Sequence, residues 1–141
     1  MTATPLYHVG VLVNDIEAAM AHFGAELGLT FNEPRVIRLD DLEEAGQPAP
    51  ARDLKVVYSV EGPPYLELIE AQEGGVWGHH HGEGLHHIGS YHDDLAGRVA
   101  QLIEAGTPPE CTVKMGGELI AIYLGPEHTH NARLELVRRA L

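Results

Sequence analysis

Apolar and polar positions change their spacing near residue 14, which predicts a strand followed by a helix. Residues 9–13 carry a valine at every second position, and this period of two is typical of a strand with one buried face. Over residues 16–27 the apolar positions instead recur after three, four, seven and eleven residues, which indicates a helix. Asn14 or Asp15 is suited to cap the start of this helix, and Gly28 is suited to end it.

The same strand, cap and helix return later in the chain, so the sequence contains an internal repeat. His8 aligns with His87 and Gly10 aligns with Gly89 at a constant offset of 87 − 8 = 79 residues. In the second copy, we expect Asp93 to cap the helix. The chain therefore holds two copies of one strand-helix unit.

Short β-rich stretches follow each helix. We expect strands near residues 29–38, 54–60 and 64–70 in the first half, and near residues 110–115, 118–124 and 132–138 in the second. Residues 40–53 are rich in proline and acidic residues and predict an exposed loop. The pattern predicts a single α+β domain, residues 1–141, built from two tandem βαβββ modules. The modules span about 5–72 and 84–140, and a linker at about 73–83 joins them.

Composition narrows the expected partners and compartment. Nine Lys and Arg against 21 Asp and Glu give a net charge of −12, which argues against binding of nucleic acid or of an anionic membrane. No run approaches the roughly 20 apolar residues that a membrane span needs, and the first residues lack the basic start of a signal peptide. Cys111 is the only cysteine, so a reducing cytoplasm is expected. The expected partner is a small-molecule substrate.

Both modules place one histidine and one glutamate at equivalent strand positions. Glu67 and Glu135 stand at the centre of a Leu-Glu-Leu sequence, so each glutamate faces away from its leucines. His8 and His87 alternate in the same way with apolar neighbours that favour the helix side. A twofold relation between the modules would bring the four side chains together. Two imidazoles and two carboxylates favour one divalent metal ion (Zn, Ni, Co, Mn or Fe) and leave two octahedral positions open for water or substrate oxygens.

Other histidines and aromatic residues are expected to have structural roles. The histidines at 79–81 predict an exposed loop between the modules rather than a lid over the site. His86 alternates away from His87, and His92 stands at the start of the second helix. Trp77 is expected either to cover the mouth of the cavity or to pack between the modules. Three tyrosines are expected either to line the open face or to pack at its rim: Tyr58, Tyr91 and Tyr123.

Four segments resemble the vicinal-oxygen-chelate superfamily: HVGVLVND, YLELIEA, GLHHIGSYHDD and ARLELV. This superfamily includes glyoxalase I, methylmalonyl-CoA epimerase, extradiol dioxygenases, fosfomycin-resistance enzymes and bleomycin-binding proteins. The resemblance covers almost the whole chain, and it implies a curved, barrel-like mixed sheet with helices on the outside and a homodimer. In the glyoxalase and epimerase branches, each module supplies a histidine and a Glu or Gln to the metal. Those positions are here His8, Glu67, His87 and Glu135.

Two features depart from these branches. The aromatic pair in the first helix of glyoxalase I is replaced by His22-Phe23. No clear cluster of basic residues is present for the carboxylates of glutathione or the phosphates of coenzyme A. The resemblance therefore leaves the substrate open.

The resemblance implies a metal-dependent glyoxalase-like enzyme, either a lyase or an isomerase or epimerase. The metal would chelate neighbouring oxygens of a small organic substrate and stabilise an enediolate, while Glu135, with Glu67 as the alternative, moves a proton. An extradiol-type ring-cleaving dioxygenase is the second interpretation, although a fourth ligand would occupy room that dioxygen and a catechol need. The third is a non-catalytic protein that binds a small molecule or antibiotic and confers resistance, and such proteins do not need the four ligands.

Overall fold

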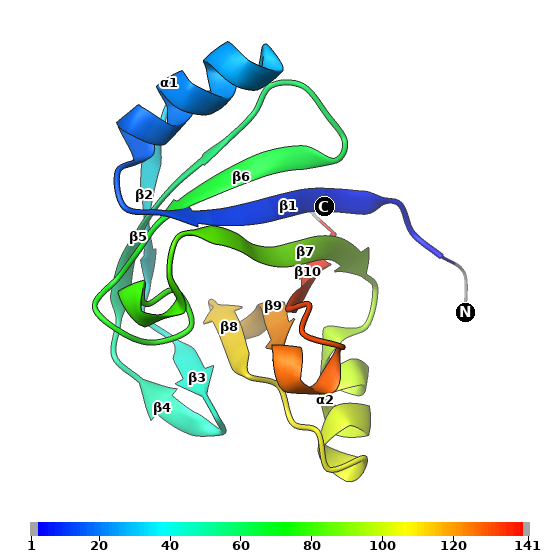
Figure 1. Ribbon diagram of the computed structural model, residues 1–141. Helices are drawn as coiled ribbons and strands as arrows, with labels where there is room; N and C mark the ends of the chain where they lie inside the picture. Colours follow the sequence, from blue (N-terminus) through cyan, green and yellow to red (C-terminus); the bar gives the residue numbers. More distant parts are fainter. Residues whose placement is uncertain (1–2, 140–141) are drawn as a thin grey trace.

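A curled sheet of ten strands, with two helices on its outside, makes up the described part of the protein (Figure 1). The computed structural model describes residues 3–139. The helices and strands, in chain order, are β1 (Leu6–Val13), α1 (Ile16–Leu27), β2 (Arg35–Leu39), β3 (Leu42–Glu44), β4 (Gln47–Ala49), β5 (Arg52–Tyr58), β6 (Tyr65–Glu70), β7 (Gly84–His92), α2 (Leu95–Glu104), β8 (Cys111–Met115), β9 (Glu118–Leu124) and β10 (Leu134–Arg138). Two short 3-10 helices span His79–His81 and Pro126–His128. The predicted α+β class and barrel-like mixed sheet are confirmed.

Both helices begin with an aspartate cap. The side chain of Asp15 accepts a hydrogen bond from the backbone N–H of Ala18, and α1 ends at Gly28 in the left-handed conformation. In the second copy, the cap is Asp94, which accepts from the N–H of Gly97. The expectation of Asp93 is therefore wrong by one residue, and the observed caps stand at the repeat offset, 94 − 15 = 79.

The two modules join through their first strands. The strand order is β2-β5-β6-β1-β7-β10-β9-β8-β3-β4. β1 and β7 pair antiparallel at the centre, and each pairs on its other side with the last strand of its own module in parallel. This arrangement is mirrored about the β1–β7 pair, as a twofold relation between the modules requires.

The strands predicted within the modules are present, and their ends differ by a few residues. β5, β6, β8, β9 and β10 begin and end within two residues of the predicted stretches. β2 begins only at Arg35. Upstream of it, Phe31 forms an isolated bridge with Ser59, and Pro34 has no N–H to donate to a strand ladder.

The expectation of an exposed loop at residues 40–53 is wrong. β3 and β4 form a hairpin there, and β3 pairs antiparallel with β8 of the second module. Leu42 is only 3% exposed, whereas Glu43 and Pro48 lie on the solvent side. Strands of three residues are too short to display a period of two, and their outward polar residues produce the composition of a loop.

This hairpin shows why the sheet curls. β2 is at one end of the strand order and β3 lies near the other, yet only Asp40 and Asp41 separate them in the chain. The two ends of the sheet must therefore approach each other. The backbone N–H of Lys114 in β8 donates to the carbonyl of Asp41 over 3.0 Å, which fixes the crossing chain to the second module.

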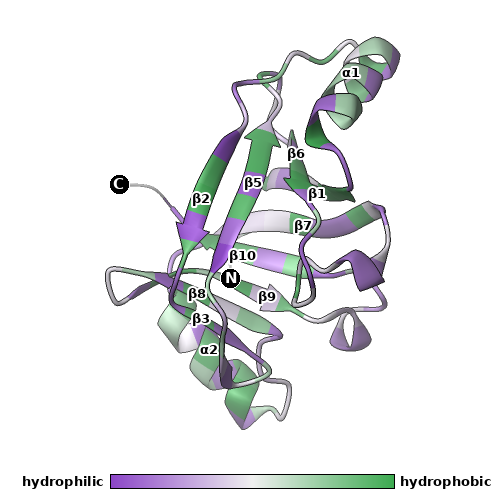
Figure 2. Cartoon of the chain, turned by 90° about the vertical axis from the view of Figure 1, so that its left-hand side faces the viewer, coloured by the Kyte–Doolittle hydropathy of each residue, from purple (hydrophilic) through white to green (hydrophobic). Residues whose placement is uncertain are grey.

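Apolar side chains fill the inside of the curl and the two faces under the helices. Val11, Val13 and Leu68 pack beneath α1, as the alternation predicts, and Ile122 packs beneath α2. In Figure 2, β5 is hydrophilic at its start and hydrophobic toward its arrowhead. The cluster inside the curl contains Leu12, Leu39, Leu42, Leu54, Val56, Ile69, Val76, Trp77, Cys111, Val113, Ala121 and Tyr123.

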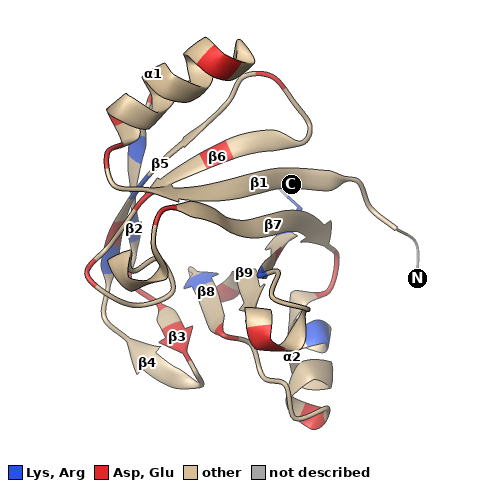
Figure 3. Ribbon diagram, in the orientation of Figure 1, with Lys and Arg blue, Asp and Glu red and all other residues tan. Residues whose placement is uncertain are grey.

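Basic residues lie on several separate elements of the described chain rather than in one patch (Figure 3). The two α-helices have 12 and 10 residues. Within residues 3–139, no helix has the length and apolar character needed to cross a bilayer.

Candidate metal centre and active-site cavity

Strand register places the four predicted ligand side chains at the centre of the sheet. Gly10 of β1 is paired with Glu67 of β6 on one side and with His87 of β7 on the other. The second module repeats this pairing around Gly89 of β7. The partners of Gly89 are His8 of β1 and Glu135 of β10.

The four side chains converge on one point. The Nε2 atom of His8 lies 2.8 Å from the Nε2 atom of His87 and 2.8 Å from Oε1 of Glu135. His87 Nε2 lies 3.2 Å from Oε1 of Glu67 and 3.2 Å from Oε1 of Glu135. One nitrogen or oxygen from each residue falls within a group whose members are all within 4.8 Å of one another, and all four residues are buried. The structure thus brings the predicted set together.

Two glycines make room for the histidine rings. A Cβ atom added to Gly10 would stand 2.2 Å from Cε1 of His87, and one added to Gly89 would stand 2.2 Å from Cε1 of His8. Real Cβ atoms do not approach other atoms so closely. Each ring therefore lies across the glycine of the opposite module, and the repeated His-x-Gly spacing has a packing cause.

A cavity of about 420 Å³ opens onto the two carboxylates. Glu67 and Glu135 belong to its lining, together with Tyr7, Tyr58 and Tyr123. The basic residues of the wall are Arg35 and Arg138. The rest of the wall is apolar and consists of Ile37, Leu39, Leu54, Val56, Ile69, Trp77, Val113, Met115, Ile120, Ala121 and Val137. A ligand bound in this cavity would contact the two glutamates.

Each glutamate has a tyrosine opposite it on the neighbouring strand. Tyr58 is paired with Glu67 and Tyr123 with Glu135. Burial, followed by the nearby carboxylate charges, raises the pKa of both tyrosines well above their usual value, so both phenols keep their protons. Of the three tyrosines named from the sequence, these two line the cavity. Tyr91 instead stacks on Tyr7 with ring centroids 4.6 Å apart.

The charges of the four residues depend on one another. Burial acts to lower the pKa of His87, but its contacts with Glu135 and Glu67 outweigh this effect and raise the pKa to about 9. Burial acts to raise the pKa of Glu135, but hydrogen bonds from His8 and His87 hold it well below its usual range. In the absence of a metal ion, the cluster therefore binds a proton tightly between the histidines and the carboxylates.

The arrangement also fits a divalent cation. Two ligands at right angles, each about 2.1 Å from one ion, are about 3.0 Å apart. The contacts that His8 and His87 make with each other and with the carboxylates measure 2.8 to 3.4 Å. Oε1 of Glu67 is buried without a hydrogen-bond partner, and a cation would satisfy it. This nitrogen and oxygen donor set suits Zn, Ni, Co, Mn or Fe(II).

His86 does not point away from His87 as alternation predicts. The pairing of β1 with β7 shifts between Gly10 and Val11, and this β-bulge leaves His86 as an extra residue. His86 Nδ1 lies 2.8 Å from Nδ1 of His87, and burial, followed by the proximity of His87, lowers the pKa of His86 to about 3. Sequence reasoning missed this contact because a bulge resets the alternation by one residue.

The remaining named residues have the following positions. Trp77 is buried, and its Nε1–H donates to the hydroxyl of Tyr123 over 3.3 Å, so it belongs to the inner wall. Residues 79–81 are exposed, as expected, and form a 3-10 helix. His92 accepts the backbone N–H of Asp94 at the start of α2, also as expected.

Comparison with known proteins adds to this geometry. Residues 7–123 match the Glyoxalase/Bleomycin resistance protein/Dioxygenase superfamily. No curated protein sequence matches the chain.

Solved structures of methylmalonyl-CoA epimerases share the fold. A Streptomyces coelicolor enzyme variant in complex with 2-nitronate-propionyl-CoA has a TM-score of 0.69 and 22% identity, with 99% of this chain and 100% of that chain covered. The Mycobacterium tuberculosis enzyme has a TM-score of 0.69 and 20% identity, with 100% and 94% covered. An epimerase in complex with methylmalonyl-CoA and NH4+ has a TM-score of 0.68 and 23% identity, with 99% and 96% covered. At these identities the likeness concerns the fold, and the match over residues 7–123 decides the family: the chain belongs to the glyoxalase/bleomycin resistance protein/dioxygenase superfamily.

Proposed function

We propose that this protein is a metal-dependent isomerase or epimerase that moves a proton at a carbon next to a carbonyl group. One observation carries the proposal: Glu67 and Glu135 line the cavity, while the two histidines stand behind them and contact both carboxylates. Two carboxylates from opposite modules can face the two sides of one substrate carbon. A mere binding protein has no need of such a pair.

The residues that would hold the metal are His8, Glu67, His87 and Glu135. A divalent ion there supplies Lewis-acid stabilisation of negative charge on neighbouring substrate oxygens, which would occupy the two coordination positions that the protein leaves free. In the metal-free protein, His8 holds Glu135 through the 2.8 Å contact between Nε2 and Oε1, and a bound ion would take the place of this contact. The Nε2 atoms of both histidines would be ligands, so they must be free of protons in the loaded protein.

Glu135 is proposed as the base. Its carboxylate takes the proton from the substrate carbon, and the electron pair of the broken C–H bond moves toward the carbonyl, which becomes an enolate-type oxygen. Return of the proton to a neighbouring atom gives an isomer. Delivery of a proton to the opposite face by Glu67, when this carboxyl is protonated, inverts the carbon, and exchange with solvent restores both glutamates.

The cavity supports a substrate with an acyl or similar apolar part. Its wall is mostly apolar beyond the carboxylates, with Arg35 and Arg138 as the basic residues of the lining. Several structural neighbours are epimerases, and two of the structures named above are complexes with 2-nitronate-propionyl-CoA and methylmalonyl-CoA. We therefore propose a small carbonyl compound with a second oxygen close to the acidic carbon, and acyl thioesters as the first compounds to test.

A ring-cleaving dioxygenase has less support. Such sites keep three positions open for dioxygen and a bidentate substrate, whereas four donor side chains converge here. A homodimer in the cytoplasm stays part of the proposal. Light scattering tests the dimer, and a mass of 15.3 kDa at micromolar concentration would contradict it.

The test is proton exchange with solvent. The metal-loaded protein is incubated with methylmalonyl-CoA, and then with a panel of α-hydroxy ketones and 2-substituted acyl thioesters, in deuterium oxide. We expect deuterium to enter the carbon next to the carbonyl, and we expect Glu135→Gln to slow its entry about 100-fold or more while metal stays bound. Undiminished exchange in both Glu135→Gln and Glu67→Gln with metal bound would contradict the proposed bases.

A further inference from the structure

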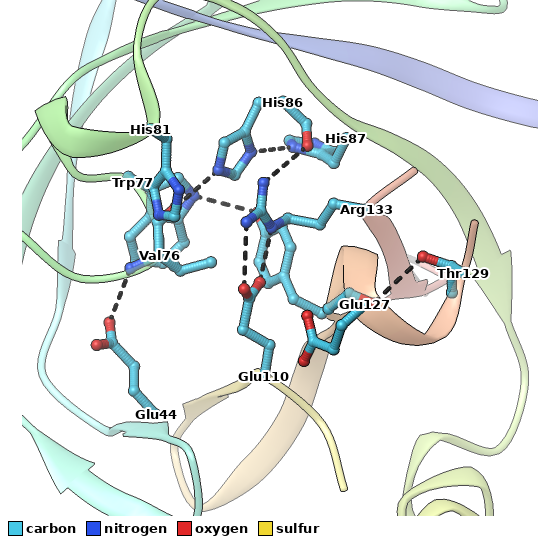
Figure 4. A network of polar contacts seen from close by, with 12 residues as sticks. Glu44, Val76, Trp77, His81, His86, His87, Glu110, Glu127, Thr129 and Arg133 are labelled. Atoms are coloured by element: carbon cyan, nitrogen blue, oxygen red, sulfur yellow. Dashed lines mark hydrogen bonds and ion pairs between the residues drawn. The ribbon is translucent and has the colours of Figure 1, made fainter. Parts of the chain in front are cut away.

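A chain of hydrogen bonds leads from the backbone of the linker to Nδ1 of His87, the ring nitrogen opposite the one that faces the candidate metal site (Figure 4). His86 Nε2 lies 2.7 Å from the carbonyl oxygen of Val76. His86 Nδ1 lies 2.8 Å from Nδ1 of His87. His86 is 4% exposed and His87 is 3% exposed, so water does not compete for these bonds.

The direction of the protons follows from the end of this chain. The carbonyl oxygen of Val76 can only accept, so Nε2 of His86 must donate its hydrogen. In a neutral imidazole the other nitrogen is then bare, and Nδ1 of His86 must accept from Nδ1–H of His87. With one proton of His87 fixed on Nδ1, Nε2 is the nitrogen that gives up the shared proton of the cluster when a metal ion binds, and its lone pair then faces Glu67 and Glu135.

The surroundings of His86 favour the neutral ring. Among the described residues, its two ring nitrogens contact only Val76 and His87. The guanidinium of Arg133 donates to the backbone carbonyl of His86 over 3.2 Å, so a positive charge already lies close by. Glu110 holds this guanidinium through two contacts, at 2.7 and 3.1 Å. A second cation on His86 would be buried without a carboxylate partner.

Among the described residues, module one has no hydrogen bond equivalent to the one between His86 and His87. The residue equivalent to His86 is Tyr7, because 86 − 79 = 7, and Tyr7 is the extra residue of a bulge between Leu6 and His8 in β1. Its ring packs edge-on against His8 with centroids 4.6 Å apart. Nδ1 of His8 is buried and has no hydrogen-bond partner. The two histidines of the site therefore differ in how they are held.

We propose that His86 is a positioning residue, which receives the Nδ1 proton of His87 and so keeps Nε2 of His87 open toward the metal site. The proposal rests on the proposed function only in taking the cluster as a metal site. Its proton direction is a property of the metal-free protein. It gives the histidine of module two a hydrogen bond at Nδ1 that His8 of module one lacks.

The first experiment uses the unaltered, metal-free protein labelled with ¹⁵N in its histidines. Coupling across the N–H···N hydrogen bond between residues 86 and 87 is measured by NMR. We expect one proton bonded to Nδ1 of His87 and coupled to a bare Nδ1 of His86. A proton bonded to Nδ1 of His86 instead would overturn the proposal, whatever the activity of the protein.

The second experiment separates the two bonds of His86 with two amides. In His86→Asn the side-chain oxygen can take the place of Nδ1 and still accept from His87, whereas in His86→Gln the amide reaches the place of Nε2 and serves only Val76. Titration with Co²⁺ should show a loss of affinity of about 10- to 100-fold in His86→Gln and a clearly smaller loss in His86→Asn. The exposed His80→Gln variant is the control, with unchanged affinity.

Folding and function are kept apart in this design. Thermal unfolding of the metal-free variants shows whether each one is folded, and the NMR experiment needs no variant. Affinity of folded His86→Gln equal to that of the unaltered protein would refute the positioning role. If Co²⁺ binding follows the expected order but no substrate exchanges its proton, the proposed reaction fails and the role of His86 stands.

Discussion

Each module places a histidine and a glutamate, the proposed metal ligands, at the same strand positions, but the two modules surround the histidine differently. In module two, His86 is hydrogen bonded to His87, while in module one Tyr7 packs against His8 and leaves Nδ1 of that ring without a partner. Strand pairing thus duplicates the positions of the ligands, because both copies use the same neighbours across the central strands. The bulge residue is the position at which the copies diverge. A repeated backbone can therefore hold two equivalent histidines with different hydrogen bonds at Nδ1.

The glutamates offer the largest expected effect with which to test this asymmetry. Glu135 Oε1 is 2.8 Å from His8 Nε2, whereas Oε1 of Glu67 lacks a hydrogen-bond partner. We expect Glu135→Gln to lower turnover by about 10²- to 10⁴-fold, the range for losing a general base, with the metal still bound. If the reaction is an isomerisation, Glu67→Gln should lower turnover less than Glu135→Gln does. If the reaction inverts a chiral carbon, the two variants should lower turnover equally. Steady-state rates and metal analysis of both variants test this prediction. A larger loss of turnover in Glu67→Gln than in Glu135→Gln would make Glu67 the base.

The two glycines under the histidine rings give the next largest effect. Gly10→Ala and Gly89→Ala both put a Cβ atom 2.2 Å from a ring carbon, so we expect each to lower metal affinity by about 10- to 100-fold. The ring of His87 is hydrogen bonded through Nδ1 to His86, whereas Nδ1 of His8 has no such partner. Gly10→Ala should therefore also lower the melting temperature more than Gly89→Ala. Equal melting temperatures would show that the His86 contact does not hold the ring.

The sequence was sufficient to predict the parts of the site that obey a regular period. His8 and His87 alternate with valine or isoleucine, Glu67 and Glu135 alternate with leucine, and the 79-residue offset relates the two histidines. These rules depend only on strand geometry and on the repeat. They predicted which face the side chains occupy, and strand pairing then brought the faces together.

Alternation fails where the strand is irregular or short. A bulge inserts one residue and reverses the face of the next, so His86 and Tyr7 could not be placed from the sequence. The β3–β4 hairpin was missed because Leu42 is its one strongly buried residue among polar neighbours. Its pairing with β8 depends on the curl of the whole sheet, which is a long-range property that no local pattern contains.

The number of protons released on metal binding should also distinguish module two, which contains His87, from module one. The pKa of His87 is raised above that of an unfolded histidine to about 9, so its contribution to stability is complete below about pH 6.5 and is lost as the pH rises through 9. Between these values, a metal ion must displace the proton. We expect release of about one proton per ion at pH 7.5, and His87→Ala should abolish this release. Calorimetry in buffers of different ionisation enthalpy measures it, and metal uptake without proton release would contradict the shared proton.

The helix caps give the smallest expected effect, and here the modules should behave alike. Asp15 accepts the N–H of Ala18 over 3.1 Å, and Asp94 accepts the N–H of Gly97 over 2.9 Å. Replacing either aspartate with alanine leaves that N–H without its partner, so each variant should lose about 1 kcal/mol of unfolding free energy. For a domain of this size the melting temperature should fall by roughly 3–5 °C. Both caps lie outside the set of four ligand residues, so Co²⁺ affinity should not change. A change in Co²⁺ affinity in one variant alone would show that the asymmetry extends beyond the bulge residues into the helices.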